Sequence, residues 1–83
     1  MQVTVKLFAL LSRYLPPGAR DNQVLLEVPD AATPDLIIAQ LAIPHGQCHL
    51  LLVNGVYIPP GAREQYVLQP GDVLALWPPV AGG

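Results

Sequence analysis

Alternation of apolar and polar residues opens the chain. Val3, Val5 and Leu7 fall on one face of an extended segment and polar side chains on the other, which predicts a half-buried strand over residues 2–8. Leucines spaced four apart then favour a short helix over 9–15, because residues at that spacing share one helix face. A proline pair and a glycine should end that helix, and the two-residue period returns in a second predicted strand over 23–28.

The clearest helix signal begins at Thr33. Its hydroxyl can cap the helix, Pro34 suits the first turn, and Asp35 places a negative charge near the positive end of the helix dipole. Apolar residues follow at helical spacing and should pack on a sheet: Ile37, Ile38 and Leu41.

The second half of the chain predicts a hairpin and a final strand. Residues 49–53 are apolar along most of their length, which is typical of a central strand. Asn54-Gly55 favours a type I′ turn, so 56–58 should return beside that strand. Pro70-Gly71-Asp72 predicts another turn, and 73–77 should form the last strand.

In chain order these elements predict an α+β fold, with a mixed sheet and its helices packed on one face. The small size and the helix that connects the sheet halves suggest a β-grasp topology. Residues 1–77 should form the domain and 78–83 an extended C-terminal arm. Pro78 and Pro79 cannot join a helix and bias the residues before them toward extended geometry. The six residues of the arm can therefore reach about 20 Å beyond the sheet.

The composition adds a surplus of apolar residues. Hydrophobic residues fill 52% of the 83 positions and charged residues only 12%, about half the usual charged share of roughly 25%. A domain of this size buries only about 60–65% of its unfolded surface. The chain is either a proline-rich monomer or a subunit whose exposed apolar patch meets a partner, and the surplus favours the partner.

Charge and cysteine content exclude several functions. The net charge is −2 and the four basic residues are scattered, whereas nucleic-acid binding requires a basic patch or stripe. The single cysteine excludes an internal disulfide framework and fits a reducing compartment. The first residues do not resemble a signal peptide, and no apolar run is long enough to span a bilayer. We expect a cytoplasmic protein that binds neither nucleic acid nor membrane.

Side chains suited to catalysis are sparse. His45 and His49 flank Cys48, but neighbours in a strand point to opposite faces, which opposes a cysteine–histidine pair. The spacing of these residues also lacks the paired pattern of a zinc site. The six carboxylates are spread over turns, a helix cap and strand faces. We expect a scaffold that is not an enzyme on its own and binds no metal or cofactor.

The group that remains is the α-carboxylate of Gly83. With a reference pKa of about 3.5 it is ionised and unreactive at neutral pH, so it must be activated, for example as an acyl-adenylate made by a separate ATP-using enzyme. Gly82 and Gly83 carry no side chains and allow the backbone to approach another surface closely. A frayed terminus without function is the alternative, and the stiff residues directly before the glycines disfavour it.

Two stretches carry a resemblance to a known family. Val53-Asn54-Gly55, and the run from Leu68 to Gly83 that ends Trp77-Pro78-Pro79-Val80-Ala81-Gly82-Gly83, resemble the MoaD/ThiS family of ubiquitin-like sulfur carriers. The ending Pro-Pro-Val-Ala-Gly-Gly is similar to that of the branch that supplies the small subunit of molybdopterin synthase. The opening strand and the Thr33 helix fit as well, so the resemblance spans essentially the whole chain.

The resemblance implies a ubiquitin-like β-grasp fold and a chemistry for Gly83. A ubiquitin-activating-type adenylyltransferase would use ATP to adenylate Gly83, and a sulfur donor would convert it to a thiocarboxylate. The arm would then enter the large synthase subunit, in a heterotetramer. There the sulfur would pass to cyclic pyranopterin monophosphate to form the dithiolene of molybdopterin, and the catalytic side chains would lie on the large subunit.

We expect partners to dock near the last strand, on Phe8, Leu76 and Trp77, and along the arm residues Pro78, Pro79, Val80, Ala81 and Gly82. Trp77 stands where the family usually carries phenylalanine, and the loop over 59–65 is rich in proline. These departures leave open a carrier for a tungsten cofactor or another thiolation pathway. Thiamine thiazole synthesis and ubiquitin-like modification of lysines are further alternatives.

Overall fold

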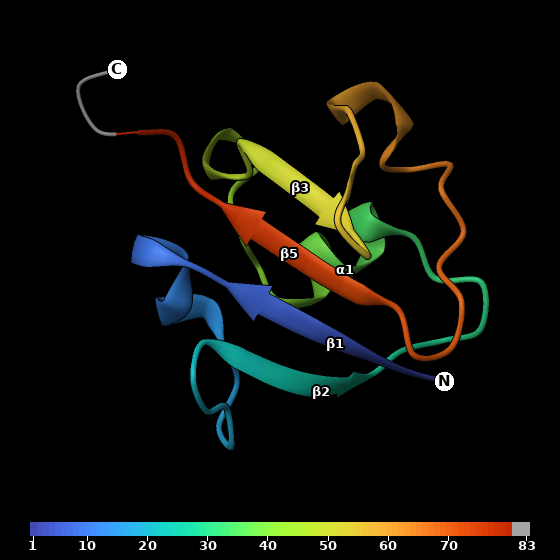
Figure 1. The fold of residues 1–83 in the computed structure, drawn as a ribbon, viewed down its shortest axis with the longest axis horizontal. Coiled ribbons are helices and arrows are strands. Elements are labelled where there is room, and N and C mark those ends of the chain that lie inside the picture. Colours follow the sequence, from blue (N-terminus) through green and yellow to red (C-terminus); the bar gives the residue numbers. More distant parts are fainter. Residues whose placement is uncertain (81–83) are drawn as a thin grey trace.

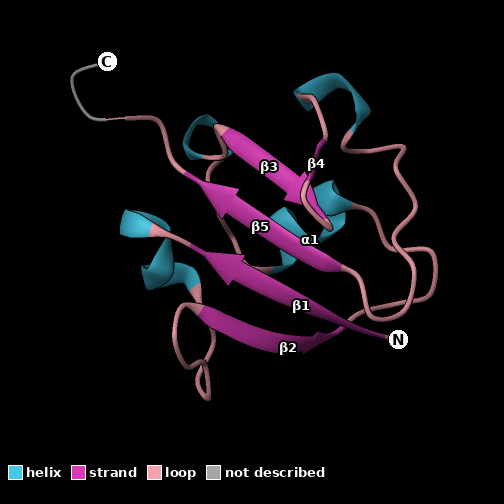
Figure 2. Ribbon diagram, viewed as in Figure 1, coloured by secondary structure: helices cyan, strands magenta, loops and turns pink. Residues whose placement is uncertain are grey.

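A computed structural model describes residues 1–80 and contains a five-stranded mixed sheet (Figures 1 and 2). In spatial order, β2-β1-β5-β3-β4, β1 and β5 run parallel, and the other neighbours are antiparallel. The strands are β1 (Gln2–Leu7), β2 (Gln23–Glu27), β3 (Leu50–Val53), β4 (Val56–Tyr57) and β5 (Val73–Trp77). The predicted α+β class with a mixed sheet is confirmed.

The α-helix α1 (Pro34–Gln40) lies behind the sheet in Figure 1. Thr33 caps it as predicted, because the Leu36 N–H donates to Thr33 Oγ1 at 3.2 Å. The described part of the chain also contains three 3₁₀ helices: η1 (Ala9–Tyr14), η2 (His45–Gln47) and η3 (Pro60–Ala62). No helix within residues 1–80 has the length and apolar content needed to cross a membrane.

The predicted helix over 9–15 is a 3₁₀ helix that ends at Tyr14. Leu15 precedes Pro16, and a residue before proline is driven toward extended geometry; Leu15 has φ −67° and ψ 136°. The Leu11 and Leu15 N–H groups donate to Phe8 and Ser12, three residues back. Pro16 therefore accounts for the end of this element, whose backbone hydrogen bonds reach three residues back and not four.

The hydrophobic core lies between the sheet and α1. Leu7, Leu51 and Leu76 face the helix from three adjacent strands, and each is 0% exposed. Ile37 and Ile38 of α1 are also 0% exposed and belong to the same cluster. Ala75 of β5 is also buried, at 8% exposed, but points away from α1. The other buried sheet residues come from alternate positions of the same three strands, which is the period-two pattern seen in the sequence: Val3, Val5, Val53 and Leu74.

Two details of the hairpin half differ from the sequence prediction. The central strand is β5, with β1 on one side and β3 on the other, whereas 49–53 was the predicted central strand. An apolar run fits any internal strand, so the pattern could not separate the two. β3 also begins at Leu50, one residue later than predicted. The register pairs Leu50 with Trp77, so the residue opposite His49 is Pro78, which has no N–H to donate.

The two predicted tight turns are confirmed and are joined to each other. Asn54 and Gly55 have φ of 51° and 83°, as a type I′ turn requires. Asp72 accepts the Gln69 N–H at 2.8 Å through Oδ2 and Asn54 Nδ2 at 2.9 Å through Oδ1. Asn54 Oδ1 accepts the Val73 N–H at 2.9 Å. Side chains thus tie the β3–β4 turn to the start of β5.

Each edge of the sheet is partly blocked against further strands. On the β2 side, Gln23 exchanges two backbone hydrogen bonds with Arg20, at 2.9 and 3.0 Å, and the Glu27 carbonyl accepts Gln40 Nε2 at 3.4 Å. On the other side β4 has only two residues and is followed closely by Pro59 and Pro60.

Candidate functional site: an open sheet face and an arm

The sheet surface opposite α1 carries several apolar residues that the core does not use. Leu52 pairs with both Ala75 and Tyr57, and Ala75 pairs with Lys6, so all four side chains project from the same surface. Tyr57 is 51% exposed. We define this surface, called the open face below, by seven residues: Lys6, Phe8, Leu50, Leu52, Tyr57, Ala75 and Trp77.

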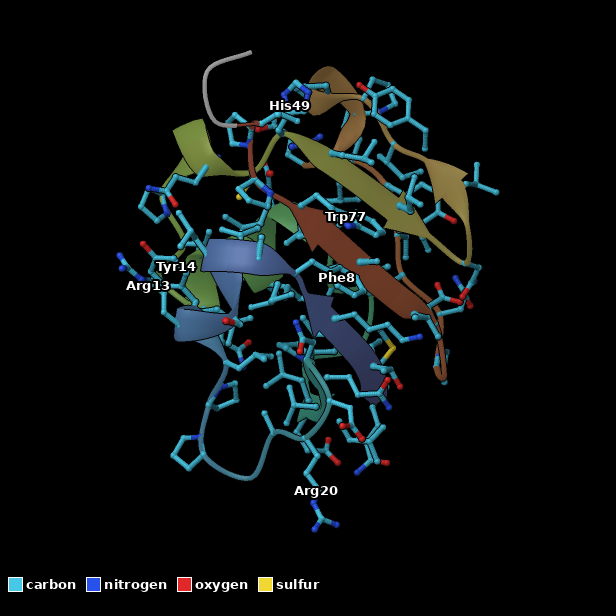
Figure 3. All side chains as sticks on the ribbon, turned by 60° about the vertical axis from the view of Figure 1, so that its left-hand side comes forward. Phe8, Arg13, Tyr14, Arg20, His49 and Trp77 are labelled. Atoms are coloured by element: carbon cyan, nitrogen blue, oxygen red, sulfur yellow. The ribbon has the colours of Figure 1, made fainter. Side chains whose placement is uncertain are left out.

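Phe8 and Trp77 form an aromatic stack at one end of the open face. Their ring centroids are 4.5 Å apart and their planes differ by 11°, and the two side chains lie side by side in Figure 3. The Phe8 N–H also donates to the Leu76 carbonyl at 3.1 Å, which extends the β1–β5 pairing by one residue. Both backbone and rings therefore fix Trp77, the last residue of β5.

The arm begins directly after this stack. Because β1 and β5 are parallel, the arm leaves at the end of the sheet where β1 finishes, away from the N-terminus (Figure 1). Pro78 is half-buried, Pro79 is exposed and Val80 is 77% exposed. The predictions for Ala81, Gly82 and Gly83 lie outside the described residues, and the docking role of the arm stays a prediction.

Leu76 does not fit the docking surface predicted for it. Its side chain is 0% exposed and packs in the core with Leu7 and Leu51. Neighbours along a strand face opposite ways, so the orientation that brings Trp77 to the open face turns Leu76 toward α1. We therefore remove the Leu76 side chain from the proposed surface and keep Phe8 and Trp77.

Cys48 and its flanking histidines do not form a reactive group. The thiol is buried and donates to the Pro44 carbonyl at 3.6 Å, whereas His45 and His49 are exposed. Burial raises the pKa of the Cys48 thiol; Arg63 opposes this shift and Asp35 reinforces it. A buried thiol that keeps its proton is a weak nucleophile. Within residues 1–80, no three histidine, cysteine or acidic side chains are grouped to hold a metal ion.

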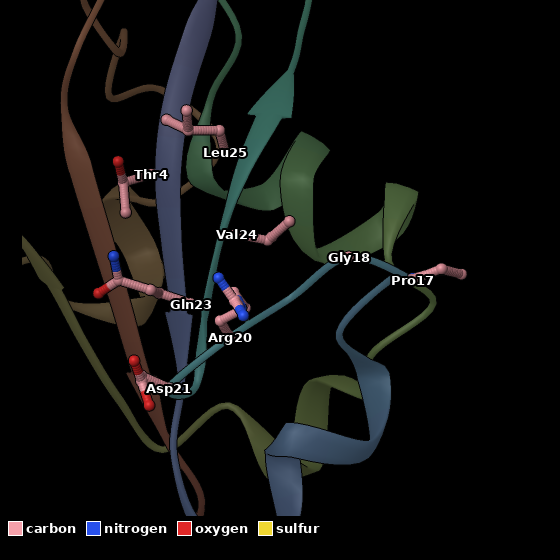
Figure 4. Close-up of a pocket in the computed structure, with 8 residues that line it drawn as sticks. All are labelled: Thr4, Pro17, Gly18, Arg20, Asp21, Gln23, Val24 and Leu25. Atoms are coloured by element: carbon pink, nitrogen blue, oxygen red, sulfur yellow. The ribbon is translucent and has the colours of Figure 1, made fainter.

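A shallow hollow lies beside the antiparallel pair β1 and β2 (Figure 4). Its eight lining residues come from β1, from β2 and from the loop before β2: Thr4, Pro17, Gly18, Arg20, Asp21, Gln23, Val24 and Leu25. The ionisable side chains among them are one arginine and one aspartate, which do not supply a nucleophile with its base. The hollow adds no catalytic site.

Arg63 is a feature that the sequence analysis missed. It is 4% exposed and is the one charged side chain buried within residues 1–80. Its guanidinium donates to three backbone carbonyls, at 2.8 to 3.2 Å. The sequence signal for a buried arginine was weak. Arg63 follows the proline-rich stretch Pro59-Pro60-Gly61-Ala62, and nothing in this spacing separates it from the other scattered basic residues.

The topology, the helix on one face and the projecting arm define a ubiquitin-like β-grasp domain. The model of the ThiS family matches residues 5–83. The chain therefore belongs to the ThiS family, and its assignment to the MoaD/ThiS group of ubiquitin-like sulfur carriers is confirmed.

Solved structures of the same fold agree with this assignment. SAMP1 from Haloferax volcanii is 26% identical over the whole of both chains, with a TM-score of 0.68. The Haloferax volcanii HVO 2177 protein is 25% identical over all of this chain and 87% of its own, with a TM-score of 0.72. Molybdopterin-converting factor from Helicobacter pylori, a complex of subunits 1 and 2, matches at 24% identity over the whole of both chains with a TM-score of 0.62 and shows the fold alone. The comparison with curated proteins found no match.

Proposed function

We propose that this protein carries sulfur as a thiocarboxylate at Gly83 and donates it to cyclic pyranopterin monophosphate in the synthesis of molybdopterin. The observation that carries the proposal is the match to the ThiS family, which extends through the Pro-Pro-Val-Ala-Gly-Gly ending to residue 83. The rigid β5 end and the exposed, proline-stiffened start of the arm support it, because they suit a main-chain group delivered into another protein's pocket.

The proposed chemistry has two steps. A Gly83 carboxylate oxygen attacks the α-phosphorus of ATP on an adenylyltransferase, so an acyl-adenylate forms and pyrophosphate leaves. Hydrosulfide, or a donor that supplies sulfur at the same oxidation level, then attacks the acyl carbon; AMP leaves and a proton is released. The product is a thiocarboxylate, whose sulfur is a softer nucleophile than a carboxylate oxygen. The carrier supplies the acyl group and its delivery, and the partners supply the catalytic side chains.

The proposed docking surface is the open face together with the arm. Phe8 and Trp77 lie where that face meets the arm, so a partner that covers the face also receives residues 78–83. In the Helicobacter pylori neighbour, subunit 1 is in complex with subunit 2, which supports a large synthase subunit as one such partner. The adenylyltransferase is the other.

Intact-mass spectrometry tests the chemistry. The protein is incubated with ATP, a ubiquitin-activating-type adenylyltransferase and a sulfur donor. The expected product is heavier by the difference between one sulfur and one oxygen, and it is absent when ATP is omitted or Gly83 is deleted. Transfer is then scored with the large synthase subunit and cyclic pyranopterin monophosphate. Conversion without transfer assigns the carrier to another thiolation pathway, and adducts on lysines of other proteins assign it to protein modification.

A pair of surface substitutions tests the docking surface. Tyr57→Glu places a charge on the open face, whereas Leu36→Glu places the same charge on α1, behind the sheet; the two side chains are 51% and 42% exposed. We expect Tyr57→Glu to weaken binding to the large subunit by about tenfold or more, equivalent to about 1.4 kcal/mol, and Leu36→Glu to leave it within about twofold. Equal affinities for the two variants would contradict this surface.

A further inference from the structure

The buried guanidinium of Arg63 has no acidic partner within residues 1–80. The ion pairs found there join the Met1 ammonium to Glu27 and Asp30, and neither involves Arg63. Burying an unpaired charge is costly unless polar groups replace its hydration. In Arg63 that replacement comes from backbone carbonyls alone, so the guanidinium is held by main-chain geometry.

The three carbonyls come from both ends of the β3–β4 hairpin. Arg63 Nε donates to Ile58 at 3.2 Å, just after β4. Nη1 donates to Cys48 at 2.8 Å and Nη2 to His49 at 3.2 Å, just before β3. A planar guanidinium presents its donors in a fixed fork, so one side chain sets the relative position of these segments.

The shortest of these bonds leads directly to the arm. The Cys48 carbonyl and the His49 N–H belong to one planar peptide unit. The carbonyl of that unit accepts from Arg63 Nη1, and its N–H donates to the Trp77 carbonyl at 3.1 Å. This bond to Trp77 adds to the ladder register, which already pairs Leu50 with Trp77.

The Trp77 carbonyl belongs in turn to the peptide unit that joins Trp77 to Pro78. The link from Arg63 therefore passes through two rigid peptide planes in series and ends at the bond where the arm starts. Hydrogen bonds in such a chain polarise and strengthen one another. Pro78 then fixes its own φ near −65°, so the orientation of the second plane sets the direction of the following residues.

We propose that Arg63 is a positioning residue that sets the direction in which the arm leaves the sheet. The proposal rests on the proposed function, because direction matters only if the arm must enter a pocket. A tilt of about 15° at the start of a six-residue arm about 20 Å long displaces its tip by about 5 Å. Misplacement of about 1 Å at a reacting centre can cost about a hundredfold in rate.

Nuclear magnetic resonance of the full chain tests the geometry without any partner. In the wild type, a scalar coupling across the hydrogen bond should join the His49 amide nitrogen to the Trp77 carbonyl carbon; its absence would overturn the proposal. In weakly aligned samples of Arg63→Met, the residual dipolar couplings of His49 and Val80 should depart from values that fit the wild-type orientation. Unchanged Val80 couplings in a folded Arg63→Met variant would also overturn it.

Controls separate positioning from stability. Val3→Ala removes core volume near the start of β1, and Val28→Ala removes it just after β2, both at the end of the sheet opposite the arm. The variant whose urea midpoint is nearest that of Arg63→Met is the matched control. Its Val80 couplings should not change. Arg63→Lys keeps the charge without the fork, and its Val80 couplings should lie between those of the wild type and Arg63→Met; this variant replaces Arg63→Met if the latter does not fold.

Kinetics with the adenylyltransferase test the consequence. A misdirected arm on an intact docking face should lower kcat for acyl-adenylate formation by at least about tenfold and leave KM within about twofold. The matched control should change kcat by less than about twofold. If Arg63→Met and the control have equal kcat values, Arg63 only stabilises the fold. A wild-type protein that forms no adenylate refutes the proposed function instead, and the dipolar couplings still decide the geometry.

Discussion

The stack of Phe8 on Trp77 predicts a measurable coupling between two residues that are 69 positions apart in sequence, the difference between 77 and 8. The perturbation is the pair Phe8→Leu and Trp77→Leu, alone and combined, because leucine keeps an apolar side chain and removes the rings. A centroid separation of 4.5 Å lies at the close end of the favourable range, where aromatic pairs contribute about 0.5–1.5 kcal/mol beyond their buried area. We expect a coupling free energy of about 1 kcal/mol.

The assay is equilibrium unfolding in urea, followed by circular dichroism because Trp77 is the one tryptophan of the chain. A domain of 83 residues should have a free energy of unfolding of about 4–12 kcal/mol. If the wild-type value lies in the upper part of that range, the double variant stays folded. The control pair is Phe8→Leu with Thr33→Ala, which joins an arm-end residue to the cap of α1 and should be additive. A Phe8–Trp77 coupling below about 0.3 kcal/mol, the level of independent sites, would refute the stack as a stabilising contact.

Three further predictions concern the backbone and the thiol. Ala42 follows α1 with φ 58°, a position that favours glycine, so Ala42→Gly should raise the free energy of unfolding by about 0.5–1 kcal/mol in urea; a decrease would contradict this. Asn54→Ala should lower the free energy of unfolding by about 2–3 kcal/mol, because two side-chain hydrogen bonds are lost and alanine must adopt positive φ. Asn54→Gly loses the same hydrogen bonds without the strain, so the free energy of unfolding should fall by less. Equal losses in the two variants would show that the turn geometry contributes nothing. Burial raises the pKa of the Cys48 thiol in the folded state. The protonated thiol therefore contributes fully to the free energy of unfolding below the ordinary thiol pKa, and this contribution is lost as pH rises through the raised value. The unfolding free energy of the wild type should therefore fall faster than that of Cys48→Ala above about pH 8.5; parallel curves would refute the shift.

The elements with strong local causes could be predicted from the sequence. Thr33 and Pro34 begin α1, and Asn54-Gly55 forms the predicted turn, because capping and positive φ depend on the residues themselves. The last strand, 73–77, was predicted with its observed bounds. Each of these signals is contained within a few neighbouring positions.

The features that escaped prediction depend on residues distant in sequence. Leu76 and Trp77 are both apolar, and only the sheet register shows that one enters the core and the other the open face. The burial of Arg63 requires carbonyls from Cys48, His49 and Ile58 to converge, which no spacing in the sequence encodes. The stack of Phe8 on Trp77 likewise follows from parallel pairing of the first and last strands.

The partly blocked edges of the sheet affect how such a chain behaves at high concentration. An exposed strand edge is a template for addition of further strands, and hence for fibrils. On the β2 edge, the backbone N–H and carbonyl of Gln23 are hydrogen-bonded to Arg20. On the other edge, β4 ends after two residues. The apolar side chains of the open face lie where another protein can cover and release them, whereas free backbone groups along an edge would let identical chains add to one another without limit. A carrier that must pass between partners needs reversible contacts of the first kind.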